Sequence, residues 1–266
     1  MTVSHALFSR LRQQAADAVL VAAHRGDSRH HPENTLAAFA AAAAVGVAVQ
    51  EFDVQRSRDG VLVCMHDAGL DRTTDSARQL GPGALVAQTT WNELQRLDAG
   101  AWFSGAHAGE RIPTMAQALA VILPGGIPLI EHKAGTAADF VAELDRLGVH
   151  ERCILQSFDW SFVQAAHRLN PGIALALLGP TATHAALDDD AIRAALAAGA
   201  GMLHWQANDL TRSAVAACHS ANLLVCSYTT DDELGWVGGA GIGIDIMCTN
   251  DPDAMRRLST NGGLRR

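Results

Sequence analysis

Short apolar runs alternate with helix-like stretches along the chain, and this alternation limits the possible folds more than any other feature. The runs with the length and apolar character of buried strands cover residues 19–23, 48–53, 127–131, 153–156, 173–177, 201–204, 223–228 and 244–248. Helical patterns follow most of them, at residues 34–45, 137–147, 160–169, 190–198, 212–221, 232–237 and 252–258. Such alternation predicts parallel strands with helices packed outside. Eight strand–helix units predict a closed (β/α)8 barrel, the TIM barrel.

Two further stretches refine this prediction. A doubly wound nucleotide-binding sheet would need a Gly-x-Gly-x-x-Gly turn after its first strand, and residues 24–34 contain none. The glycine-rich residues 238–241 follow a helical pattern instead, so we expect a loop there. Residues 67–113 are irregular and too long for an ordinary βα loop, which predicts a small inserted cap. We therefore expect a single barrel domain over residues 1–266 that carries this cap.

Composition excludes several classes of protein. The formal net charge is −8, and we find no basic stripe for nucleic acid and no basic cluster for anionic membranes. No apolar run reaches the roughly 20 residues of a membrane span, and the first residues lack the order of a signal peptide. The five cysteines are scattered, mostly within apolar runs, as expected for buried thiols in a reducing compartment. We expect a cytoplasmic protein with no stable membrane anchoring and no nucleic-acid partner, of unspecified oligomeric state.

The chain contains nineteen arginines and a single lysine, Lys133. A compositional bias toward arginine explains why lysine is scarce, but it does not explain why one lysine is retained. A site that accepted either cation would carry arginine under such a bias. Lys133 is therefore a candidate for a role that needs a compact ammonium group.

Chemically capable side chains gather at the ends of the first two predicted strands. The first strand ends in His24-Arg25, and the second ends in Glu51-Phe52-Asp53. Residues two apart on a strand point to the same side, so Glu51 and Asp53 face the barrel mouth together. The active site of such a barrel lies at the carboxyl ends of the strands. Two carboxylates there suit a hard cation, although a solvated edge is the alternative.

The next strands add to the same mouth. Glu131 and Lys133 end the third predicted strand and share a face, either as part of a site or as a plain ion pair. His66 follows a short apolar run at residues 61–65. Three inward carboxylates without a cation would repel one another. A divalent metal, two side-chain cations and a singly charged phosphodiester would formally neutralise them.

Several motifs together closely resemble the glycerophosphodiester phosphodiesterase family, in particular its compact cytosolic bacterial members. They are Ala23-His24-Arg25-Gly26, Pro32-Glu33-Asn34-Thr35, Glu51-Phe52-Asp53-Val54, His66-Asp67, Leu70-Asp71-Arg72-Thr73-Thr74 and Glu131-His132-Lys133. The resemblance implies a TIM barrel with a small inserted cap. It implies one divalent cation, Mg²⁺ or Ca²⁺, held by the residues matching Glu51, Asp53 and Glu131.

The resemblance also implies roles for the other groups at the mouth. His24 and His66 match the acid–base pair, and Arg25 and Lys133 match the residues that contact the phosphate. The possible substrate pocket comprises Tyr228, Ser157, Trp102 and Phe103.

The sequence departs from the family pattern at several places, including His30-His31 before Pro32. His132 stands between Glu131 and Lys133 where the family often has isoleucine, and we expect it to point away from the mouth. Tyr228-Thr229-Thr230-Asp231 stands where the family usually has Trp-Thr-Val-Asn, so that Tyr228 keeps an aromatic wall and Asp231 bears on leaving-group preference. Thr249-Asn250 stands where the family usually has Thr-Asp.

The resulting hypothesis is metal-assisted hydrolysis of a glycerophosphodiester, such as glycerophosphocholine or glycerophosphoethanolamine, to glycerol 3-phosphate and an alcohol. We favour His24 as base and His66 as acid, with the order left open by the sequence. One alternative is a lysophospholipase D, for which Trp91, Trp102 and Phe103 would supply an apolar entrance. A further alternative is a non-catalytic phosphodiester-binding barrel.

Overall fold

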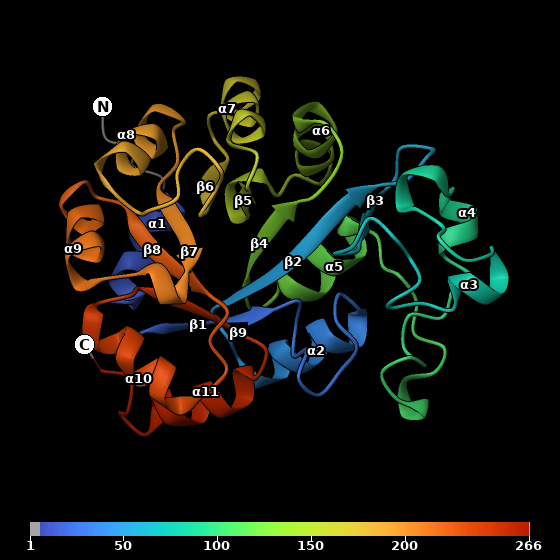
Figure 1. Ribbon diagram of the computed structural model, residues 1–266, viewed down its shortest axis with the longest axis horizontal. Coiled ribbons are helices and arrows are strands. Elements are labelled where there is room, and N and C mark those ends of the chain that lie inside the picture. Colours follow the sequence, from blue (N-terminus) through green and yellow to red (C-terminus); the bar gives the residue numbers. More distant parts are fainter. Residues whose placement is uncertain (1–5, 266) are drawn as a thin grey trace.

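The computed structural model describes residues 6–265, and over this range the chain forms the predicted closed barrel of eight parallel strands (Figure 1). The barrel strands are β1 (Leu20–His24), β2 (Val49–Arg56), β4 (Ile127–His132), β5 (Ile154–Ser157), β6 (Ala174–Gly179), β7 (Met202–Gln206), β8 (Leu224–Tyr228) and β9 (Ile246–Thr249). Strand β1 pairs with both β2 and β9, which closes the sheet on itself. The prediction of a TIM barrel is confirmed.

Helices surround the barrel (Figure 1). They are α2 (Leu36–Val45), α5 (Met115–Ile122), α6 (Ala137–Leu147), α7 (Trp160–Leu169), α8 (Asp189–Ala197), α9 (Arg212–Ser220), α10 (Glu233–Ile242) and α11 (Pro252–Thr260). Helix α5 is short, follows the irregular stretch and was not predicted from the sequence. The expectation of a loop at residues 238–241 was wrong, because α10 continues through these glycines to Ile242. There, Gly239 lies so close to Met247 that a Cβ would clash with its sulfur.

The strands alternate between two apolar layers, as the period of two in side-chain direction requires. Outward-facing residues such as Phe52, Ile130 and Leu155 pack against the surrounding helices. Inward-facing residues such as Leu129 and Ile154 fill the barrel. Helix α1 (Ala6–Gln14) joins this inner cluster through Leu7, Phe8 and Leu11, which are buried. The carboxyl ends of the strands carry the polar inward-facing residues.

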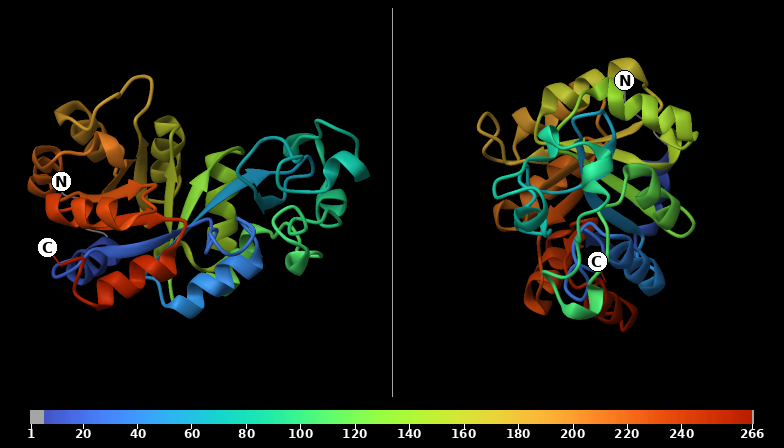
Figure 2. Two further views of the ribbon diagram at one scale, coloured as in Figure 1. Left: turned by 60° about the horizontal axis from the view of Figure 1, so that its bottom comes forward. Right: turned by 90° about the vertical axis from the view of Figure 1, so that its right-hand side faces the viewer.

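The segment between β2 and α5 projects from one side of the barrel (Figure 2). It begins with β3 (Leu62–Cys64), which pairs antiparallel with the end of β2. Short helical turns follow: α3 (Ser76–Gln79), η1 (Val86–Gln88), α4 (Trp91–Leu94) and η2 (Gly105–His107). The segment has an apolar cluster of its own, which includes Leu70, Leu94 and Leu97. Among the described residues, no helix is long and apolar enough to cross a membrane.

Candidate active site

Three carboxylates meet at the carboxyl end of the barrel. Glu51 and Asp53 lie on β2, and Glu131 lies on β4 in register with Asp53. One oxygen of each lies within 4.8 Å of the others, and all three residues are buried. The two-residue spacing on β2 and the parallel register of β2 with β4 together produce this cluster.

The mutual repulsion of these carboxylates favours a bound cation. Burial, followed by the charges of Asp53 and Glu131, raises the pKa of Glu51 well above its usual range. Burial and Asp53 raise the pKa of Glu131 to about 7, although Lys133 opposes this shift. The Oε1 atom of Glu51 is buried without a hydrogen-bond partner among the described residues. A hard divalent cation would satisfy that oxygen and offset the repulsion, so the three carboxylates fit a metal site.

Two side-chain cations flank the carboxylates. Nζ of Lys133 lies 2.8 Å from Oε1 of Glu131 and 3.8 Å from Oδ1 of Asp53. Burial alone would lower the pKa of Lys133, but Glu131 and Asp53 outweigh it and raise that pKa. Nε of Arg25 lies 3.2 Å from Oδ2 of Asp53. The backbone N–H of Arg25, in the left-handed region with φ 57°, donates to Glu51 at 3.2 Å. Both cations therefore stay charged beside the carboxylates.

His24 ends β1 and is held by a neutral partner. Its Nδ1 lies 2.7 Å from the Oδ1 atom of Asn250, which follows β9. Because an amide oxygen only accepts, Nδ1 is the donor and Nε2 of the neutral ring keeps a lone pair. Burial and the charge of Arg25 lower the pKa of His24, so the ring is neutral near pH 7. This is the state in which an imidazole can accept a proton.

His66 follows β3 and is held by a charged partner. Its Nδ1 lies 2.6 Å from Oδ1 of Asp67. The guanidinium of Arg72 binds Asp67 and lowers the pKa of that carboxyl to about 2, with a further contribution from His66. Arg72 also donates to both oxygens of Glu33 at 2.8 Å, and Glu33 accepts from Arg25 at 2.8 Å. A continuous set of charged hydrogen bonds thus joins His66 to Arg25.

Asn34 has a structural role that the sequence analysis missed. It adopts φ 57°, and its Nδ2 donates to Oδ2 of Asp53 at 2.9 Å while its Oδ1 accepts from the backbone N–H of Asp53 at 3.2 Å. The neighbouring residue, Thr35, caps α2 by accepting from the N–H of Ala38. Asparagine tolerates the left-handed region better than most residues, which is the signal that could have identified it.

The proposed pocket residues on β5 and β8 are placed differently. Tyr228 faces inward, its ring 5.1 Å from that of His204, and its hydroxyl donates to the carbonyl of Gly179 at 2.8 Å. The expectation for Ser157 is contradicted: its side chain is buried on the outward side of β5, where it bonds Nδ1 of His132 at 3.0 Å. His132 also points outward as expected, stacked on Phe162 with 3.6 Å between ring centroids. The alternation along β5 sends Ser157 opposite to the inward-facing Gln156.

The aromatic residues of the inserted segment contact one another and the β1–α2 loop. The rings of Trp102 and Phe103 are 5.7 Å apart, and Phe103 lies 5.6 Å from His107. His107 in turn contacts His31, 5.2 Å away, in the loop after β1. Trp102 is 40% exposed. The aromatic group therefore links the inserted segment to the barrel and leaves one indole at the surface.

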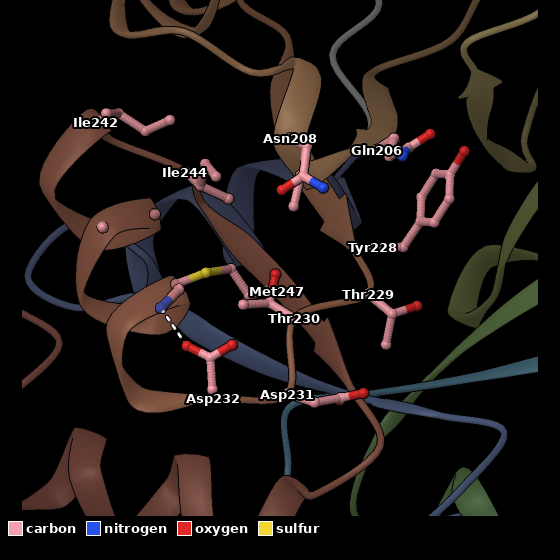
Figure 3. Close-up of a pocket in the computed structure, with 14 residues that line it drawn as sticks. Gln206, Asn208, Tyr228, Thr229, Thr230, Asp231, Asp232, Ile242, Ile244 and Met247 are labelled. Carbon is pink, nitrogen blue, oxygen red and sulfur yellow. Dashed lines mark hydrogen bonds between the residues drawn. The ribbon is translucent and has the colours of Figure 1, made fainter.

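A cavity of about 800 Å³ adjoins the carboxyl ends of β7 and β8 (Figure 3). Tyr228 and Gln206 form its side toward the barrel, and Ile242, Ile244 and Met247 its apolar back. The β8–α10 loop, with Asp231 and Asp232, forms the remaining rim. The three carboxylates of the cluster do not line this cavity.

The sequence motifs and this site match one family of proteins. The model of the glycerophosphoryl diester phosphodiesterase family matches residues 24–254. The chain belongs to this family. The match begins at His24 and runs beyond Asn250, so every residue of the site described above lies within it.

Individual relatives agree with this family assignment. The chain is 31% identical over 258 residues to a glycerophosphodiester phosphodiesterase of Caldanaerobacter subterraneus, covering 92% of this chain and 99% of the relative. It is 29% identical to a glycerophosphodiester phosphodiesterase of Bacillus subtilis, covering 91% of this chain and 87% of the relative. A phosphodiesterase of Oleispira antarctica, solved with the product sn-glycerol-3-phosphate, is 27% identical with a TM-score of 0.82, covering 91% and 97% of the two chains.

Proposed function

We propose that the protein hydrolyses small glycerophosphodiesters, such as glycerophosphocholine or glycerophosphoethanolamine, to glycerol 3-phosphate and an alcohol. The observation that carries the proposal is the buried cluster of Glu51, Asp53 and Glu131 flanked by Arg25 and Lys133. Cations beside a carboxylate cluster suit a metal-bound phosphodiester. Membership in the family and the similarity to a structure solved with glycerol 3-phosphate support the same substrate class.

Glu51, Asp53 and Glu131 would hold the divalent cation. Oxygen ligands suit Mg²⁺ and Ca²⁺ alike, so we propose one of these two ions. When bound, such an ion polarises the phosphoryl group and lowers the pKa of a coordinated hydroxyl. Asn34 supports the site by fixing both the backbone and the carboxylate of Asp53.

The different partners of the two histidines support separate roles. His24 donates from Nδ1 to a neutral amide, which leaves Nε2 to accept the proton of the attacking hydroxyl or water. His66 donates from Nδ1 to the ionised Asp67, which stabilises a positive ring. His66 then gives a proton to the alcohol oxygen as the phosphorus–oxygen bond breaks. Arg25 and Lys133 stabilise the charge that develops on the phosphoryl oxygens.

Lysolipids are the second substrate class to test, because Trp102 exposes part of its indole on the inserted segment. An exposed indole on the inserted segment is suited to an acyl chain as well as to packing. Activity on lysophosphatidylcholine that needs detergent micelles would favour a lysophospholipase D. Activity confined to soluble diesters would exclude it.

We also propose that the protein works in a reducing compartment, namely the cytoplasm. All five cysteines are buried as free thiols, with none of them paired. Buried unpaired thiols are common where disulfides do not persist. A redox-sensitive reporter fusion or cell fractionation would test this location.

The test of the proposed function is coupled release of glycerol 3-phosphate from glycerophosphocholine. Protein stripped of metal with a chelator receives Mg²⁺, Ca²⁺ or Mn²⁺ in turn, and His24→Ala serves as the control. We expect turnover that requires metal and disappears in the variant. Folded protein that releases no glycerol 3-phosphate with any of these ions would refute the proposal.

A further inference from the structure

We propose that Asp231 is a positioning residue for His24, acting through the side-chain amide of Asn250. The inference rests on the proposed function only in taking His24 as the base. Asp231 lies in the β8–α10 loop, Asn250 follows β9 and His24 ends β1, so three separate strands supply one chain of hydrogen bonds. Asp231 itself does not bond His24.

The carboxylate of Asp231 fixes how the amide of Asn250 is turned. Oδ1 of Asp231 accepts from the backbone N–H of Asn250 at 2.7 Å and from the Thr249 hydroxyl at 3.1 Å. Oδ2 of Asp231 accepts from Nδ2 of Asn250 at 2.7 Å. An ionised carboxylate can only accept hydrogen bonds, so the NH₂ end of the Asn250 side chain must face Asp231. Its oxygen end is left to face His24.

The oriented amide in turn fixes the proton on His24. Oδ1 of Asn250 lies 2.7 Å from Nδ1 of His24 and 2.9 Å from the hydroxyl of Ser28. The single hydroxyl proton of Ser28 is shared with the carbonyl of His24, which lies 2.7 Å away. An amide oxygen only accepts, so Nδ1 of His24 must donate to it, which places the proton of the neutral imidazole on Nδ1. Nε2 is then the atom with the free lone pair. Asn250 thus donates to Asp231 and accepts from Nδ1 of His24, which leaves Nε2 of His24 without a proton.

Because an amide and not a carboxylate contacts Nδ1, the position of the proton on His24 is fixed without a negative charge beside the ring. The charged groups that act on His24 are Arg25, Asp53 and Glu33, and the buried His204 also lies near it. A carboxylate bonded directly to Nδ1 would favour the positive ring, whereas an amide fixes the tautomer and leaves the ring neutral. A base must be neutral before it accepts a proton.

The neighbouring residue Asp232 provides a matched control. Both carboxylates border the same cavity, but they turn in different directions (Figure 3). Asp232 caps α10 by accepting from the N–H of Gly235 at 2.8 Å. Asparagine caps helices as well as aspartate does, so Asp232→Asn changes the same charge without disturbing Asn250.

Asp231→Asn should reverse the direction of the hydrogen bond between the side chains of residues 231 and 250. The backbone N–H of Asn250 must keep an acceptor, so the new amide turns its oxygen there and its NH₂ toward the Asn250 side chain. The Asn250 amide then has to flip, and it presents NH₂ to Nδ1 of His24. The proton of the ring moves to Nε2, where it blocks acceptance of another. We expect kcat to fall by roughly 10- to 100-fold with KM little changed, while Asp232→Asn retains the native kcat.

Exchange of the two residue types should return the proton of His24 to Nδ1. In the double variant Asp231→Asn with Asn250→Asp, the new amide at 231 again donates toward position 250. The new carboxylate at 250 accepts from Nδ1 of His24 and from Ser28. We expect the double variant to recover part of the kcat lost in Asp231→Asn, because the carboxylate at 250 returns the proton to Nδ1 but also favours the positive ring. A loss caused only by damage to the loop would not be recovered by a second change at Asn250.

The position of the proton can be measured independently of turnover. Proton–nitrogen NMR of protein labelled with ¹⁵N-histidine distinguishes the two tautomers, and the signal of His24 is assigned by its loss in His24→Gln. We expect the proton on Nδ1 in the native protein and in the double variant, and on Nε2 in Asp231→Asn. A native ring protonated on Nε2 would overturn the inference, as would Asp231→Asn with the kcat of Asp232→Asn. Absence of glycerol 3-phosphate release from the native protein would refute the proposed function and leave the NMR result to decide this inference.

Discussion

Nδ1 of His66 lies 2.6 Å from a carboxylate oxygen of Asp67, the next residue in the chain. The same carboxylate is held by Arg72, which keeps it ionised and fixed. A fixed negative charge at Nδ1 stabilises the positive imidazole, so it supports His66 as the proton donor. His24 has no such charge at its own Nδ1, where the neutral Asn250 takes that place.

The role of His66 predicts a dependence on the leaving group. A nitrophenolate leaves readily without a proton, whereas choline alkoxide needs one. His66→Ala and Asp67→Asn should therefore lose much more activity on glycerophosphocholine than on a nitrophenyl phosphodiester. The measurement compares kcat/KM of each variant on the two substrates.

His24→Ala is the control for this comparison, because loss of the base slows both substrates alike. Equal losses for His66→Ala on both substrates would contradict the assignment of His66 as acid. A larger loss for His24→Ala on glycerophosphocholine alone would mean that the two roles are exchanged.

Lys133→Arg should lower kcat/KM by on the order of 10- to 100-fold. Nζ of Lys133 fits between Glu131 and Asp53, at 2.8 and 3.8 Å, and a planar guanidinium cannot occupy the same point. The reverse exchange, Arg146→Lys, alters an exposed pair with Glu143 and should leave activity unchanged. Native kcat/KM in Lys133→Arg would show that the site needs only a positive charge.

Asn34→Ala should weaken metal affinity by roughly 10- to 100-fold, because it frees both the backbone and the carboxylate of Asp53. The measurement is activity titrated with Mg²⁺ or Ca²⁺, supported by calorimetry of cation binding. Asn222→Ala is the matched control, since Asn222 also adopts a left-handed backbone, at φ 62° against 57° for Asn34. Equal cation affinity in the two variants would contradict the role of the Asn34 side chain in the metal site.

The metal-free protein should lose stability as the pH rises from about 4.5 to about 7. The pKa of Glu131 is raised from its ordinary 4.5 to about 7 by burial and by Asp53. In this window the folded state binds more protons than the unfolded chain, so the free energy of unfolding falls with pH. Glu131→Gln stays neutral, so it should not show this decrease, which is on the order of 3 kcal/mol for the native protein.

Thermal melts in chelator across this pH range, for the native protein and Glu131→Gln, would measure the difference. Added Mg²⁺ or Ca²⁺ should stabilise the native protein above pH 7 more than the variant. Parallel melting curves at every pH would contradict the proposed charge repulsion in the cluster.

Features that depend on local pattern were predictable from the sequence. The eight barrel strands follow from apolar runs, and the meeting of Glu51, Asp53 and Glu131 follows from strand spacing plus the rule that strand ends converge. The outward direction of His132 follows from alternation alone. The same rule, applied to β5, would have excluded Ser157 from the pocket.

Features that depend on distant partners were not predictable in this way. Asn34 and Asp53 bond each other across nineteen positions of sequence, and His24 and Asn250 across 226. Nothing local to Asn250 shows which end of its amide faces His24, because Asp231 decides it. The Arg72–Glu33 pair is likewise visible only once the inserted segment lies against the β1–α2 loop.

Helix α1 closes the amino-terminal end of the barrel with Leu7, Phe8 and Leu11. Because apolar side chains fill the barrel behind the site, the site opens only at the carboxyl ends of the strands. Substrate must enter, and both products must leave, through that one opening. Product that stays in the site therefore competes with the next substrate molecule for the same opening.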